Sequence, residues 1–117
     1  GAFLSGGLSI EAAFQENLPI TVVIDNNGGL TTISQQQERL FGHDRHVATD
    51  FRDIPFHSMF EGLGGYGELV EDPGEIAPAV NRAMASGRTA CINVRSRGVI
   101  SPIVAAVTSK RDKASIE

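Results

Sequence analysis

The chain of 117 residues has about the length of one domain, and its 41% apolar residues suffice for a single small core. Its formal net charge of −4, without a dense Lys/Arg patch before the C-terminal segment, argues against nucleic acid or an anionic membrane surface as the main partner. Because it has one cysteine, Cys91, and neither a recognisable signal peptide nor a run of about 20 apolar residues, we expect a cytoplasmic domain without disulfides, cysteine-based zinc sites or membrane spans.

The first predicted element is a helix over residues 9–17. Ser9 is a candidate N-cap, and Leu18-Pro19 ends the helix because a residue before proline avoids the helical region. One face of this helix carries Ile10, Ala13, Phe14 and Asn17. Before this helix the chain opens on apolar, glycine-rich residues without a methionine, whereas natural N-termini are more often polar. We therefore interpret the chain as a fragment whose upstream residues are missing.

Residues 20–24 form a continuous β-branched run, typical of a strand buried on both faces of a parallel sheet. The run ends at Asp25-Asn26-Asn27-Gly28-Gly29. Asparagine amides and glycine carbonyls offer oxygen ligands to a hard cation, and ligands of open α/β sheets bind at the carboxyl ends of strands. The alternative is an Asn-Gly hairpin turn, with Thr31 to Ser34 in the second strand. Both interpretations remain open on this segment alone.

Two more helices and a strand follow. A short polar helix is predicted over residues 34–40, and Asp53 is a candidate cap for a helix with Pro55 in its first turn. The expected buried stripe of that second helix is Phe56, Met59, Phe60 and Leu63. Glycines then lead into a short strand over residues 68–70.

The clearest helix in the chain covers residues 76–84. Asp72-Pro73-Gly74-Glu75 is an N-cap pattern, and Pro78 is tolerable if it lies in the first turn. The predicted buried stripe is Ile76, Ala79, Val80, Ala83 and Met84. Gly87 closes the helix, and residues 90–94 form the next strand.

Strands that alternate with helices predict an α/β fold, a three-layer α/β/α arrangement around a mostly parallel sheet. Only three strands are recognisable, which missing upstream strands would explain. We expect a partial domain over residues 1–97 and a C-terminal tail over 98–117. Within the tail, the apolar run 99–107 is consistent with an interface and residues 110–117 are charged.

Three other signals favour structural interpretations. Residues 62–67 match G-x-G-x-x-G, but a predicted helix precedes them and a strand follows, the reverse of a dinucleotide site. Cys91 lies mid-strand and is expected to be a buried, inert thiol. The imidazoles and carboxylate of His43, Asp44, His46 and His57 lack a recognised metal-ligand spacing, so a solvated loop is favoured.

The spacing between Gly1 and Asn27 favours the cation-site interpretation of the Asn-Asn segment over the hairpin turn. Gly1-Ala2-Phe3 resembles the end of Gly-Asp-Gly-Ala-Phe, and Asn26-Asn27 resembles the close of the motif that begins there in thiamine-diphosphate enzymes. Residues 35–41 are similar to acetolactate-synthase-like members, and residues 60–67 and 86–94 to the 2-hydroxyacyl-CoA lyase and oxalyl-CoA decarboxylase branch. The resemblance covers nearly the whole chain and implies an N-terminally truncated thiamine-diphosphate-binding fold.

The resemblance also implies a set of site residues. Asn27 would bind Mg²⁺ through its side chain and Gly29 through its backbone carbonyl, while the aspartate of Gly-Asp-Gly would lie just before Gly1. The amides of Gly1 and Ala2 would face the diphosphate. Gly28, Leu30 and Thr31 would complete the cofactor-binding set, with Leu30, Thr31 and Thr32 bordering the reacting centre. No catalytic residue is assigned, because the family's activating glutamate comes from a separate domain of a partner subunit.

The function implied is that of the thiamine-diphosphate and Mg²⁺ binding domain of a lyase or transferase that cleaves or forms C–C bonds next to a carbonyl. The enzyme would be an acetolactate-synthase-like carboligase, a 2-hydroxyacyl-CoA lyase or a 2-oxo acid decarboxylase. Its substrate would be a 2-oxo acid or 2-hydroxyacyl compound, its partners the missing N-terminal domains in a homo-oligomer, and this fragment alone would be inactive. The alternative is a non-catalytic α/β binding module that retains the scaffold only.

Overall fold

The structure is a computed structural model that describes residues 1–99, 101–102 and 105–106. The chain divides into two compact units, residues 1–27 with 53–96 and residues 28–52 with those described from Arg97 onward. No helix in the described ranges is both long and apolar enough to cross a membrane. The predicted boundary between residues 97 and 98 stays a prediction. The charged segment 110–117 lies outside the described residues, as do residues 100, 103–104 and 107 of the apolar run.

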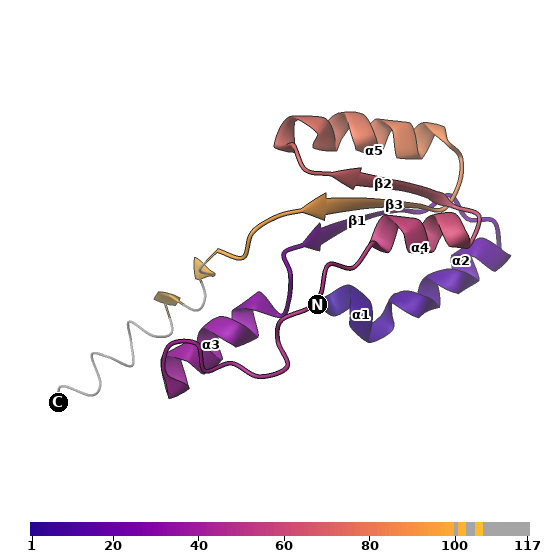
Figure 1. Ribbon diagram of the computed structural model, residues 1–117. Coiled ribbons are helices and arrows are strands. Elements are labelled where there is room, and N and C mark those ends of the chain that lie inside the picture. Colours follow the sequence, from indigo (N-terminus) through magenta and orange to yellow (C-terminus); the bar gives the residue numbers. More distant parts are fainter. Residues whose placement is uncertain (100, 103–104, 107–117) are drawn as a thin grey trace. The chain divides into compact units, whose positions relative to one another are not determined.

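A parallel three-stranded sheet forms the centre of the first unit. Strands β1 (Thr21–Asn26), β2 (Tyr66–Val70) and β3 (Ala90–Arg95) lie in the order β1-β3-β2 (Figure 1). Both neighbours pair with β3 in parallel, so that Ile92 lies between Val23 and Glu68. The central position explains why β3 is buried from Ala90 through Asn93. The predicted parallel α/β sheet is confirmed.

Helices cover both faces of this sheet. Helix α5 (Ile76–Ala85) lies on one face, and α1 (Ala2–Gly6), α2 (Glu11–Gln15) and α4 (Phe56–Gly62) lie on the other (Figure 1). Alternate side chains of β3 point to opposite faces of the sheet and so belong to two cores. Ile92 packs with α5, and Cys91 packs with Phe56 and Phe60 of α4. This is the predicted three-layer α/β/α arrangement.

The predicted helix over residues 9–17 is wrong in its extent. A 3₁₀ turn, η1 (Gly7–Ile10), precedes α2, and the N-cap of α2 is Ile10 rather than Ser9. Asn17 lies beyond the helix with φ of 53°, and Leu18 N–H donates to the Ala13 carbonyl across 2.9 Å. These are the features of a Schellman motif, in which a left-handed residue ends the helix before the proline is reached. Helix α1 was not predicted.

The predicted buried stripes of the helices α4 and α5 are confirmed at their centres and wrong at their edges. Phe56 and Phe60 of α4 are buried, whereas Met59 and Leu63 are 40% and 48% exposed. Met84 of α5 is also exposed, at 67%. Both helices are short and cover only a three-stranded sheet, so the buried stripe is narrower than the apolar pattern.

The N-terminal capping pattern predicted before α5 is present, whereas the cap predicted for α4 is wrong. The Asp72 carboxylate accepts from Gly74 N–H at 2.8 Å in the turn η2 (Pro73–Glu75), as predicted, and leads into α5. Pro78, the third residue of α5, lies in its first turn. Asp53 does not cap α4; Pro55 is its N-cap.

The second unit contains helix α3 (Thr31–Phe41). Because residues 31–34 lie in this helix, the hairpin alternative for the Asn-Gly segment is wrong. Gly29 instead forms an isolated antiparallel bridge with Asp50. The helix extends the predicted one by three residues at its start and one at its end, from 34–40 to 31–41.

Candidate functional site at the carboxyl edge of the sheet

Strands β1 and β3 end together at the carboxyl edge of the sheet. Asn26 is in register with Arg95, and Ser96 N–H donates to the Asn26 carbonyl at 3.1 Å. The Ser96 hydroxyl donates to the carboxylate of Asp25. Strand β1 is therefore held along its length, up to Asn26, the residue directly before Asn27.

Arg95 ties two loops to this edge. Its guanidinium donates to the Asp53 carboxylate and to the Glu71 carboxylate, each across 2.6 Å. Arg95 and both acids are partly exposed, so these pairs orient the loops more than they stabilise the fold. The Arg95 pair also explains why Asp53 is not available to cap α4.

An amide network lies beneath the same edge. The Asn26 side chain donates to the Ile54 carbonyl at 3.2 Å, and the Asn93 side chain lies 3.5 Å from that oxygen and 3.1 Å from His57 Nδ1. Asn93 is only 1% exposed, and its Oδ1 has no hydrogen-bond partner among the described residues. The sequence analysis did not predict this network, although Asn93, a polar residue within an apolar strand, was a signal for it.

The predicted cofactor residues of the first unit flank this network. Asn27 is half-buried and directly follows β1, while Gly1 is the N-cap of α1 and Ala2 its first residue. Phe3 of α1 packs edge-on against Phe56, with ring centroids 5.5 Å apart. Since Asn26 contacts Ile54 and Phe3 contacts Phe56, the start of α1 and the end of β1 both lie against residues 54–56.

The predicted residues of the second unit, Gly28 to Thr31, adopt an unusual turn. Phe51 N–H donates to the Gly28 carbonyl at 2.8 Å, and Leu30 N–H donates to the Thr49 carbonyl at 2.7 Å. These two hydrogen bonds flank Gly29, so the bridge does not engage the Gly29 carbonyl.

Residue 29 must be glycine in this arrangement. Gly29 is buried, and a Cβ atom there would be 2.3 Å from the Thr49 carbonyl oxygen. Leu30 is the N-cap of α3 and Thr31 its first residue. The turn therefore leads directly into a helix N-terminus, where backbone N–H groups lack intrahelical partners.

The histidines belong to different units of the chain. His57 belongs to the first unit and contacts Asn93, whereas His43, Asp44 and His46 lie in the second unit. His43 and Asp44 have exposed side chains, as expected for a solvated loop, but the His46 side chain is only 21% exposed. Cys91 is fully buried as predicted, and burial raises the pKa of its thiol to about 12.

The parallel sheet and the Asn26-Asn27 segment at the end of β1 accompany a match to a described protein family. Residues 1–94 match the model of the thiamine pyrophosphate enzyme, C-terminal TPP binding domain. The chain belongs to this family. As a TPP binding domain of this type it carries the expected α/β architecture, and the family named from its motif residues is confirmed.

The relatives of this chain include two kinds of enzyme. The chain is 36% identical over 95 residues to a probable acetolactate synthase of Mycobacterium bovis, a match that covers 80% of this chain and 17% of the relative. It is 25% identical over 107 residues to a 2-hydroxyacyl-CoA lyase of Arabidopsis thaliana, covering 88% of this chain and 18% of the relative. The chain thus spans about a sixth of the length of the curated relatives it matches.

Proposed function

We propose that this chain provides the thiamine-diphosphate and Mg²⁺ anchor of an enzyme that cleaves or forms a C–C bond next to a carbonyl. The reaction is of the acetolactate synthase type or the 2-hydroxyacyl-CoA lyase type, the two activities named for its relatives. The observation that carries the proposal is the carbonyl of Gly29, which the surrounding bridge leaves uncommitted two residues after Asn27.

Asn27 and Gly29 supply oxygen ligands to the metal ion. A side-chain amide and a backbone carbonyl are hard, neutral donors, and Mg²⁺ takes a few such ligands while phosphates and water complete its six. Two hydrogen bonds hold the backbone before Asn27 in place: Ser96 N–H donates to the Asn26 carbonyl, and the Asn26 side-chain amide donates to the Ile54 carbonyl. The donor set therefore fits the ion.

The remaining contacts to the cofactor come from backbone and loop residues. The amides of Gly1 and Ala2 face the diphosphate, because the first N–H groups of a helix lack intrahelical partners. Gly28, exposed and with φ of 82°, lets the chain turn between the two metal ligands. Leu30 and Thr31, at the start of α3, border the reacting centre.

The chemistry itself belongs to the cofactor. When bound, thiamine diphosphate would supply a nucleophilic carbanion for addition to a carbonyl, and its thiazolium ring would take up the electrons released from the adjacent C–C bond. None of the residues assigned above carries a carboxylate, so this chain orients the diphosphate and the metal and leaves proton transfer to other parts of the enzyme. Those parts are the remaining domains and a second copy of the subunit.

Calorimetric titration of thiamine diphosphate into the protein that contains this chain tests the proposal. We expect binding with Mg²⁺ and loss of binding when EDTA replaces the metal. Binding that needs the metal would justify assays with 2-oxo acids and 2-hydroxyacyl thioesters. Absence of binding in both conditions would contradict the proposal and favour a scaffold without cofactor chemistry.

A further inference from the structure

The carbonyl of Ile54 has three N–H donors within reach, each from a different part of the first unit. Phe56 N–H donates to it at 2.9 Å, the Asn26 side chain donates at 3.2 Å, and the Asn93 side chain lies 3.5 Å away. A carbonyl oxygen has two lone pairs, so it accepts well from two of these donors and only weakly from a third.

Phe56 N–H occupies one of the two lone pairs permanently. Pro55, with φ of −79° and ψ of 70°, forms an inverse γ-turn that joins this N–H to the Ile54 carbonyl. The proline ring holds φ near this value, so the turn is rigid. One lone pair remains, and the side-chain amides of Asn26 and Asn93 compete for it.

The imidazole of His57 decides this competition. Its Nδ1 lies 3.1 Å from Nδ2 of Asn93, closer than the Ile54 oxygen does. Because Nδ2 is a donor, Nδ1 accepts, and the ring is the neutral tautomer with its proton on Nε2. His57 therefore draws the Asn93 amide away from Ile54 and leaves the lone pair to Asn26.

The orientation of the Asn93 amide depends on these contacts. Asn93 is 1% exposed, and its Oδ1 has no hydrogen-bond partner within the described part of the chain. The reversed amide would place Oδ1 3.5 Å from the Ile54 carbonyl oxygen, which is unfavourable between two acceptors. Without an acceptor at residue 57, the buried Nδ2 would turn to Ile54, because an unpaired buried donor is costly.

The backbone of His57 is placed by the packing of α4 on β2. Gly67 of β2 lies so close to α4 that a Cβ atom at residue 67 would overlap the His57 carbonyl. The His57 residue itself is half-buried. The acceptor is therefore held in place by the fold and not by the amides that it orients.

We propose that His57 is a positioning residue for the metal anchor and acts on Asn27 through Asn93 and Asn26. Asn26 is the last residue of β1 and directly precedes Asn27, so freeing its side chain from Ile54 loosens the end of the strand. This inference rests on the proposed function, which makes Asn27 a ligand of Mg²⁺. His57 itself supplies no ligand atom.

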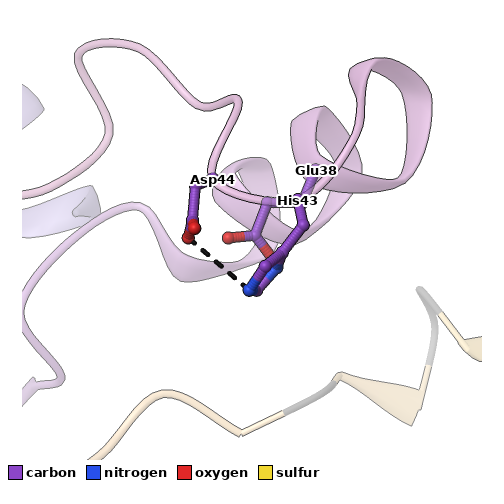
Figure 2. A group of neighbouring side chains, drawn as sticks. All are labelled: Glu38, His43 and Asp44. Carbon is purple, nitrogen blue, oxygen red and sulfur yellow. Dashed lines mark ion pairs between the residues drawn. The ribbon is translucent and has the colours of Figure 1, made fainter.

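Calorimetric titration of thiamine diphosphate, with Mg²⁺, into the protein that contains this chain tests the proposal. His57→Leu removes the acceptor and should weaken the affinity by about 10-fold or more, as loss of a group that orients a metal ligand does. His57→Asn should bind nearly normally, because its side-chain oxygen also accepts from Asn93. His43→Leu is the matched control and should bind normally, since His43 lies beside Asp44 in the other unit and its side chain is 87% exposed (Figure 2).

An Asn93→Ala background separates positioning from packing. Alanine has no amide to compete with Asn26 for the Ile54 carbonyl, so His57→Leu should then change the affinity little. If His57 acted only through packing, the loss would be the same in both backgrounds, which would overturn the proposal. Circular dichroism checks the fold of each variant, and if Asn93→Ala does not fold, the contrast between His57→Leu and His57→Asn still decides.

Hydrogen exchange of the backbone amides of residues 24–28, followed by mass spectrometry without cofactor, is independent of the proposed function. We expect faster exchange in His57→Leu and recovery in His57→Asn. If the unaltered protein does not bind thiamine diphosphate, the proposed function fails and these exchange rates still decide the role of His57. Unchanged exchange in His57→Leu, unchanged affinity where the unaltered protein binds, or no recovery in His57→Asn would overturn the proposal.

Discussion

The Cα atom of Gly29 lies so close to the carbonyl of Thr49 that a Cβ atom at residue 29 would be 2.3 Å from the carbonyl oxygen. Thr49 is 3% exposed, and its carbonyl already accepts from Leu30 N–H. The strand-like bridge between Gly28–Leu30 and Thr49–Phe51 therefore depends on the absence of a side chain at residue 29. The same bridge leaves the Gly29 carbonyl uncommitted, which ties the shape of the turn to the proposed metal ligand.

Gly29→Ala should separate the two segments of the bridge. Because backbone atoms must move, we expect a loss of about 1–3 kcal/mol in stability and at least a 10-fold weaker affinity for thiamine diphosphate. Gly62→Ala is the matched control, since a Cβ at that residue meets nothing within 4 Å. Thermal unfolding and calorimetry measure both effects, and a Gly29→Ala variant as stable as Gly62→Ala would show that the turn has room for a side chain.

Asn93→Asp tests the amide network. The substitution places a carboxylate in a site that is 1% exposed and where the amide donates toward Ile54 and His57. We expect a loss of about 3 kcal/mol or more near neutral pH, because a buried charge is costly and the carboxylate cannot donate to the Ile54 carbonyl as the amide does. Asn81→Asp makes the identical change at an exposed residue of α5 and should be nearly neutral. Equal urea midpoints for the two variants would contradict the buried network.

The pH dependence of this variant has a defined sign. Burial should raise the folded-state pKa of the new carboxyl group, so the folded state binds its proton more tightly than the unfolded state does. The destabilisation should therefore be smallest below the unfolded-state pKa and grow as the pH rises through the folded-state value. Urea unfolding across this range, with Asn81→Asp alongside, measures the difference.

Cys91 should be unreactive in the folded protein. It is fully buried in β3, and burial raises the pKa of its thiol to about 12, so the thiolate is scarce at neutral pH. We expect iodoacetamide to label it only after denaturation, as peptide mapping by mass spectrometry would show. Rapid labelling under native conditions would mean that the sheet opens at β3.

The ion pair between Arg82 and Glu68 should contribute a small, pH-dependent stability. Hydrogen bonds from Arg82, followed by one from Tyr66, hold the pKa of Glu68 below its ordinary value despite its partial burial. This stability is present above the unfolded-state pKa of Glu68 and is lost as the pH falls through the folded-state value.

Arg82→Met should therefore lower the melting temperature by a few °C near neutral pH, since surface pairs are weak, and by less in acid. The same substitution in a Glu68→Gln background should lose this trend with pH. An identical Arg82→Met effect in both backgrounds would show that the pair contributes nothing.

Sequence patterns were sufficient for the elements that packing and local preference both favour. The β-branched run of β1 and the apolar spacing of α5 predicted a strand and a helix, and both are present. The patterns failed where local geometry decides the outcome. Asn17 ends α2 by adopting a left-handed conformation. Asparagine tolerates this conformation, but the neighbouring residues give no sign that it is adopted here. Met84 fits the apolar stripe of α5 yet is exposed, because the sheet beneath is narrow.

The candidate site was predictable as a list of residues but not as a set of contacts. The motif at Asn26-Asn27 resembles the family pattern closely enough to place the chain in it, as the family match over residues 1–94 confirms. Its supports come from distant residues that no spacing rule connects, such as Asp50 opposite Gly29 and Ile54 beside Asn26. The pairing of Glu38 with His46 likewise depends on how the loop after α3 folds back.

The most direct test of the proposed metal anchor is the affinity of Asn27→Ala for thiamine diphosphate at saturating Mg²⁺. Asn27 follows β1 outside both cores, so the variant should keep its fold, measured by circular dichroism. Asn81→Ala, at an exposed position of α5, is the matched control. The account predicts that Asn27→Ala abolishes metal-dependent binding while Asn81→Ala binds normally. Unchanged affinity in a folded Asn27→Ala variant would contradict the ligand assignment and with it the proposed anchor.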